Sequence, residues 1–111
     1  MQMNFVVKND VLVVRVTGEL DHHTAVQIRE RIDCRVSDDG VMRLILDLSG
    51  LTFMDSSGIG VLIGRYKLMR SLGGTLAIVS GNVNVDKMLD LSGIRKLMGV
   101  YGKLDEAMKA V

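Results

Sequence analysis

The feature that most constrains the fold is the run from Val41 to Leu48, which is apolar at nearly every position. Only Arg43 and Asp47 interrupt it. Strict alternation of apolar and polar residues would indicate a strand with one wet face, whereas a continuous apolar run is typical of a central strand covered on both faces. The chain is therefore predicted to build a sheet that helices shield.

Strand and helix patterns alternate on both sides of this run. Two opening strands, at 3–7 and 11–16, are joined by Lys8-Asn9-Asp10, whose Asn and Asp tolerate the positive φ of a tight turn. Further strands are predicted at 41–48, 75–80 and 97–101, and helices at 24–37, 83–92 and 103–111. The second helix of the chain is predicted to run from Gly58 to Gly73-Gly74, which ends it. The predicted order is ββαβαβαβα, which indicates a single α/β domain over residues 1–111 with a mixed, mostly parallel sheet.

Two details of the helices are specific enough to test. Thr24 is predicted to cap the first helix, with Gln27 completing a capping box. Gly60 and Gly64 lie four residues apart in the second helix, where each costs about 1 kcal/mol relative to Ala. Close packing of the helix backbone against a neighbour is the expected reason for them.

Composition argues against several classes of function. The net charge is only +1 at pH 7, and the chain has two Phe, two Tyr and no Trp. Nucleic-acid binding is not expected, because it favours a basic surplus and aromatic side chains on which bases stack. The single Cys34 excludes a disulfide scaffold and indicates a reducing compartment. Neither a signal peptide nor a membrane span is predicted, so we expect a cytoplasmic protein.

The most informative polar stretch is residues 53–60, with the sequence FMDSSGIG. It follows the central strand and opens the second helix, and a helix start favours negative charge through its free backbone N–H groups. Ser56 and Ser57 have two interpretations: both are helix caps worth about 1 kcal/mol each, or one is a phosphorylation site. The physical argument alone favours capping and does not distinguish the two serines.

The same residues could serve hydrolysis or nucleotide binding, but neither has the required motif. A serine hydrolase would use a nucleophile motif such as GxSxG, which is missing here. The candidate triad residues are Ser56 or Ser57, His22 or His23, and Asp21 or Asp55. The spacing of Gly58, Gly60 and Gly64 fits neither GxxxxGK[ST] nor GxGxxG, so a dedicated nucleotide site is not predicted.

Metal and phosphoaspartate chemistry fit poorly as well. His22 and His23, with Glu19 and Asp21, offer ligand types, but adjacent residues rarely converge on one ion. A phosphorylated aspartate of the receiver kind would need acidic neighbours after the first strand, which instead leads into a hairpin. No catalytic residue, cofactor or metal is therefore predicted, and the chain is not expected to be an enzyme.

Two segments, Thr17–Ala25 and Phe53–Lys67, resemble the signature segments of STAS-domain anti-sigma factor antagonists. The resemblance extends over essentially the whole chain and includes Leu91-Ser92-Gly93-Ile94. The pair His22-His23 favours the sporulation branch, whose members antagonise the sigma-F anti-sigma factor, over the general-stress branch. A general-stress antagonist of another partner-switching pathway and a small nucleotide-binding domain are the alternatives.

The resemblance implies a regulatory cycle. The unphosphorylated protein would bind an anti-sigma factor that is also a serine kinase, and so release the sigma factor. The kinase would phosphorylate Ser56, and a serine phosphatase would restore the free hydroxyl. Asp55 would help to dock the kinase, and Ser57 would cap the second helix. The partner-binding residues that the resemblance implies are Gly18, Glu19, Leu20, Asp21, His22, His23, Asp55, Ser57, Gly58, Ile59 and Gly60.

Overall fold

The computed structural model describes residues 1–111 and confirms the predicted element order. One short 3-10 helix, η1, is the only addition to it. The elements are β1 (Gln2–Lys8), β2 (Val11–Leu20), α1 (His22–Asp39), β3 (Arg43–Met54), α2 (Ser56–Ser71), β4 (Thr75–Val79), α3 (Val83–Ser92), η1 (Ile94–Lys96), β5 (Gly99–Tyr101) and α4 (Leu104–Ala110).

The five strands form one sheet in the order β1-β2-β3-β4-β5. The pair β1–β2 is antiparallel, and every other pair is parallel, so the predicted mixed and mostly parallel sheet is confirmed. Asn9 and Asp10 form the hairpin turn with φ values of 52° and 64°, as their residue types predict. The apolar run that suggested a central strand lies in β3, in the middle of the sheet.

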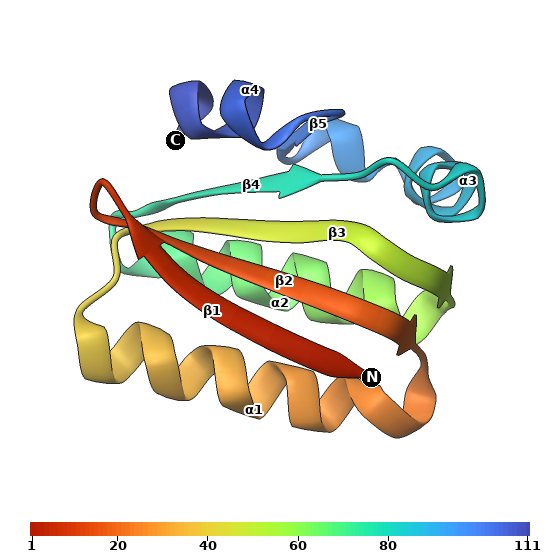
Figure 1. The fold of residues 1–111 in the computed structure, drawn as a ribbon, viewed down its shortest axis with the longest axis horizontal. Coiled ribbons are helices and arrows are strands. Elements are labelled where there is room, and N and C mark those ends of the chain that lie inside the picture. The colour runs from red at the N-terminus through yellow and green to blue at the C-terminus, as the bar shows by residue number, and fades with distance from the viewer.

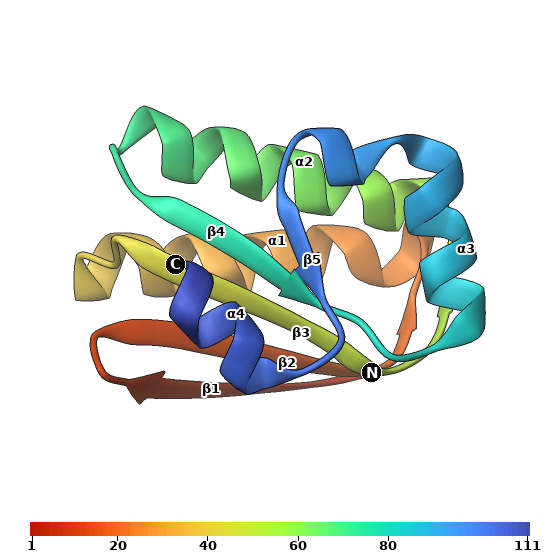
Figure 2. The same ribbon diagram turned by 90° about the horizontal axis from the view of Figure 1, so that it is seen from above.

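Helices cover the two faces of the sheet unequally. Figure 1 shows α1 and α2 on one side and α4 on the other. Because β2, β3, β4 and β5 follow one another in a single direction, their right-handed connections place the intervening helices on the same face. Figure 2 shows α4 in front of the middle of the sheet, so this short helix alone covers the opposite face.

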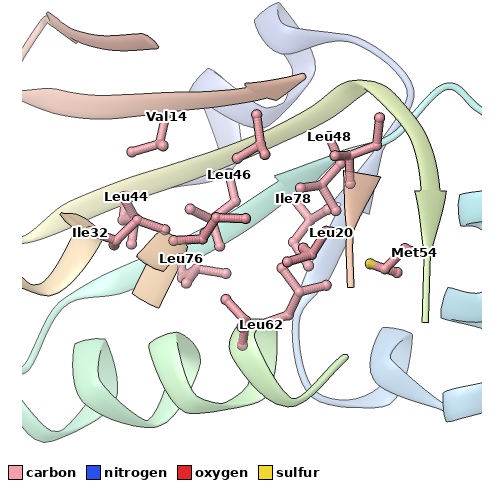
Figure 3. Close-up of a cluster of buried hydrophobic side chains, with 14 of the residues drawn as sticks. Val14, Leu20, Ile32, Leu44, Leu46, Leu48, Met54, Leu62, Leu76 and Ile78 are labelled. Atoms are coloured by element: carbon pink, nitrogen blue, oxygen red, sulfur yellow. The ribbon is translucent and has the colours of Figure 1, made fainter. Parts of the chain in front are cut away.

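The core accordingly has a large part and a small part. The large cluster of 23 buried residues fills the space between the sheet and α1, α2 and α3, and Figure 3 shows its centre. The small cluster of six contains Ala107 of α4 and strand residues of the other face. In β3, Leu44 and Leu46 belong to the large cluster and Ile45 to the small one, which confirms that this strand is covered on both faces.

Two strands are longer than the sequence pattern indicates. The predicted ends at residues 16 and 48 were wrong, because β2 continues to Leu20 and β3 to Met54. The extensions pair with each other through register shifts between Arg15 and Thr17 and between Gly18 and Glu19. Each shift breaks the alternation of buried and exposed positions, so the pattern expected of a strand is lost there.

The helices are all short or partly polar. None of them is long and apolar enough to cross a membrane.

Candidate functional site

The structure brings together the two polar segments that the sequence singled out. Leu20 and Met54 are partners at the ends of β2 and β3, and the N–H of Asp55 donates to the carbonyl oxygen of Leu20 at 3.3 Å. Each strand leads directly into a helix, so α1 and α2 begin side by side at one end of the sheet (Figure 1). We call the residues that solvent reaches there the helix-start surface. They are the exposed Glu19, His22, His23, Ser56 and Gly60 and the half-buried Asp21, Asp55 and Ser57.

The start of α1 is fixed by Asp21. Its Oδ1 accepts hydrogen bonds from the N–H groups of His23 (2.9 Å) and Thr24 (3.0 Å), and the Thr24 hydroxyl accepts one from the Asp21 N–H (3.0 Å). The prediction that Thr24 is the cap and pairs with Gln27 was therefore wrong. A carboxylate three residues earlier satisfies two free N–H groups, which moves His22 and His23 from a loop into the first helical turn.

The same contacts set the charge state of Asp21. The N–H of Thr24 lowers the pKa of its carboxyl group, burial opposes that shift, and the His23 N–H lowers the pKa further. Asp21 is thus held as a carboxylate at the positive end of α1. The rings of His22 and His23 lie next to it, edge to face, with their centroids 5.8 Å apart.

The start of α2 is fixed in the same manner by Asp55. Its Oδ1 accepts the N–H of Ser57 at 2.8 Å, and Asp55 itself has extended backbone angles, as an N-cap residue does. The expectation that Ser57 caps the helix was wrong, because the carboxylate two residues earlier takes that role. Ser56 is the first helical residue and is exposed, whereas Ser57 is second and half-buried.

Three residues expected at the partner surface lie beneath it instead. Leu20 is 1% exposed and Ile59 is 9% exposed, and both belong to the large core cluster. Gly58 is also buried, and a Cβ there would lie 2.3 Å from Cγ of Met54. These residues hold the ends of β2, β3 and α2 together and present no side chain for a partner to contact.

A contact between α3 and β3 that sequence reasoning missed has an exposed apolar residue near each of its partners. Asn82 caps α3 and also donates from Nδ2 to the carbonyl oxygen of Leu51 at 3.0 Å, which ties the start of α3 to the end of β3. Phe53 is 46% exposed and Val83 is 79% exposed on either side of this link. The residue type of Asn82 predicted a turn, but nothing in the pattern indicated that its side chain reaches β3.

The helix-start surface is acidic apart from its histidines. Glu19, Asp21 and Asp55 contribute three carboxylates, and the surface contains no Lys or Arg. The N-termini of the two helices contribute partial positive charge, but the capping carboxylates of Asp21 and Asp55 already neutralise part of it. An additional phosphate would therefore change the charge of this surface strongly without any need to enter the core.

The sequence of the chain is similar to proteins of a known family. The STAS domain family model matches residues 2–107 of the chain. The anti-sigma F factor antagonist of Paenibacillus polymyxa is 45% identical over 91 residues, which cover 82% of this chain and 78% of that relative.

Solved structures show the same fold. An anti-sigma factor antagonist from Mycobacterium paratuberculosis superposes on this chain with a TM-score of 0.91 at 29% identity. The superposition covers 99% of this chain and 92% of the antagonist. The Bacillus cell fate determinant SpoIIAA in its phosphorylated form has a TM-score of 0.74, also at 29% identity, and covers 98% of each chain.

Proposed function

This chain belongs to the STAS domain family, and we propose that it acts there as an anti-sigma factor antagonist switched by phosphorylation of Ser56. In its unphosphorylated form it binds an anti-sigma factor with serine kinase activity and releases the sporulation sigma factor. The 45% identity to an anti-sigma F factor antagonist supports this branch of the family. The protein is a substrate of the kinase and a regulator, with no catalysis of its own.

The observation that carries the proposal is the difference between the two serines. Ser56 is exposed at the first position of α2. Ser57 is half-buried, and its N–H is held by Asp55. A kinase that must reach the hydroxyl oxygen therefore meets Ser56 first.

The chemical step is a phosphoryl transfer to the Ser56 hydroxyl. Its oxygen forms a bond to the γ-phosphorus of ATP, the bond to the bridging oxygen of ADP breaks, and the hydroxyl proton leaves to a base of the kinase. A phosphatase reverses the modification by hydrolysis, which yields free phosphate and the original hydroxyl.

The phosphate acts on binding more than on folding. It adds about −1.5 to −2 charges at neutral pH. The backbone N–H groups at the start of α2 offset part of that charge, whereas Glu19, Asp21 and Asp55 add to it. A partner that fits the uncharged hydroxyl must then accommodate a dianion on an acidic surface, so the complex weakens.

The assignment of Ser56 is tested by phosphorylation with the cognate anti-sigma factor and ATP. We expect wild type and Ser57→Ala to take up one phosphate each and Ser56→Ala to take up none. Mass spectrometry of the wild-type product locates the phosphate. A phosphate found on Ser57 would overturn the assignment, and no uptake by wild type would overturn the proposed function.

A further inference from the structure

Two of the three glycines of α2, Gly60 and Gly64, are not explained by packing within this chain. Close contact was the expected reason for them, but that prediction was wrong. Apart from the adjoining backbone of α2 itself, a Cβ built at Gly60 or at Gly64 would meet no atom within 4 Å. Alanine would fit at both positions and is the better helix former, so what these positions provide is open space.

That space is a groove between α1 and α2. It has a volume of about 360 Å³, and Gly60 and Gly64 line it together with Ala25 and Val26 of α1. Its end at Ser57 is continuous with the helix-start surface, one residue from Ser56. Side chains at the two glycines would occupy the space that now lies open along α2.

Two arginines give the groove a positive charge. Arg29 and Arg65 both line it. The Arg65 side chain is only 9% exposed, and its Nη1 has no hydrogen-bond partner. Its Nε lies 2.9 Å from Oδ1 of Asp33, but neither atom makes an aligned hydrogen bond. Asp33 therefore satisfies the Arg65 guanidinium incompletely, and a buried donor without a partner is costly.

The electrostatics of Arg65 agree with this description. Burial lowers its pKa, Asp33 raises it, and the charge of Arg29 lowers it again. A second anion near the two arginines would offset both the burial and the mutual repulsion.

We propose that this groove, kept open by Gly60 and Gly64, receives a segment of the anti-sigma factor that places a carboxylate side chain between Arg29 and Arg65. The inference rests on the proposed function, since it names the contact that continues the helix-start surface along α2. The positive charge of the groove favours an acidic segment. Because Gly60 and Gly64 have no side chains, the backbone of that segment can approach α2 closely.

The first test needs no partner. The double variant Gly60→Ala/Gly64→Ala should unfold at the same temperature as wild type or higher, because the methyl groups meet open space and favour the helix. A clearly lower Tm would show that internal packing requires the glycines, and it would overturn the proposal.

The second test measures affinity for the cognate anti-sigma factor by calorimetry. Gly64→Leu fills the groove and Arg29→Glu reverses its charge, and we expect each to weaken binding by about tenfold or more. Gly102→Leu is the control for bulk, because a Cβ at Gly102 also meets nothing within 4 Å. Arg31→Glu is the control for charge, because Arg31 lies on the same helix over the Phe5 ring and does not line the groove. Both controls should bind like wild type.

The outcomes separate the two proposals. If wild type binds and both groove variants bind equally well, the groove proposal fails and the antagonist function stands. If wild type does not bind the anti-sigma factor at all, the proposed function fails and the groove proposal fails with it. If wild type self-associates and Gly64→Leu abolishes only that association, the occupant is a second copy of the chain, and the proposal is again overturned.

Discussion

Asp55 determines where α2 begins, and so it determines the position of each serine in the first helical turn. Its carboxylate accepts the N–H of Ser57 at 2.8 Å and leaves Ser56 at the first helical position. Ser56 is exposed at that position, whereas Ser57 is half-buried and lines the groove between α1 and α2. One carboxylate therefore separates two serines that the sequence presents as equivalent.

Replacing Asp55 with alanine should lower the free energy of unfolding by about 1 kcal/mol, because the cap of α2 is lost. Asp55→Asn keeps an oxygen acceptor and should lose much less. Urea denaturation with a circular-dichroism readout measures both. The assignment of the cap would be contradicted if Asp55→Ala were neutral while Ser57→Ala lost this amount.

The cap of α1 should make stability depend on acidity. The pKa of Asp21 is lower in the folded chain than its ordinary value of about 3.9 in a peptide. Protonation therefore favours the unfolded chain, so the contribution of Asp21 is complete above about pH 4 and is lost as the pH falls through the lower folded pKa. Between pH 6 and pH 2.5, the Tm of wild type should fall more steeply than that of Asp21→Asn, and parallel curves would contradict this role.

Among the elements, the helices contribute unequally to the core. Ile32 of α1 is 1% exposed within the large cluster, whereas Leu104 of α4 is only partly buried against the small one. A large cavity costs more where the surroundings are closely packed on all sides.

Ile32→Ala should therefore lower the free energy of unfolding by about 2–5 kcal/mol, and Leu104→Ala should lower it by less. Chemical denaturation of both variants at one temperature gives the comparison. A greater loss for Leu104→Ala would show that α4 and the face it covers hold the domain together, contrary to the packing described above.

The interiors of the elements were predictable from sequence, because burial repeats with the period of a strand or a helix. Apolar positions such as Ile28, Ile32 and Val36 identified α1 correctly. Boundaries failed where another interaction took over. The ends of β2 and β3 pair with each other through shifted registers, and Asp21 displaced Thr24 as a cap. The strand ends are decided by pairing between segments far apart in the sequence, and the start of α1 by a carboxylate that precedes the apolar pattern of the helix.

The candidate site was predictable in its location and less so in its parts. The two polar segments meet because β2 and β3 are adjacent and parallel, which the element order already favours. The sequence predicted less well which side chains of the site are exposed. Leu20 and Ile59 turned out buried, and the contact of Asn82 with Leu51 was not indicated by the pattern.

In the whole molecule, the helix-start surface lies at one end of the sheet (Figure 1). Ser56 is exposed on this surface and belongs to neither core cluster, whereas Leu20 and Gly58 are buried. A phosphate can therefore be added at the surface while the sheet and both core clusters stay unchanged. Separation of the switch from the core is what would let one modification control partner binding and leave the fold intact.

The most direct test compares wild type before and after phosphorylation on Ser56 by the cognate anti-sigma factor. Calorimetric titration should show affinity for that partner falling by about 100-fold or more, since like-charge contacts in an interface cost several kcal/mol. Thermal unfolding of the phosphorylated protein should remain a single cooperative transition close to that of the unmodified chain. Equal affinity in the two forms, or a loss of affinity accompanied by unfolding of the domain, would contradict a switch that acts at the surface.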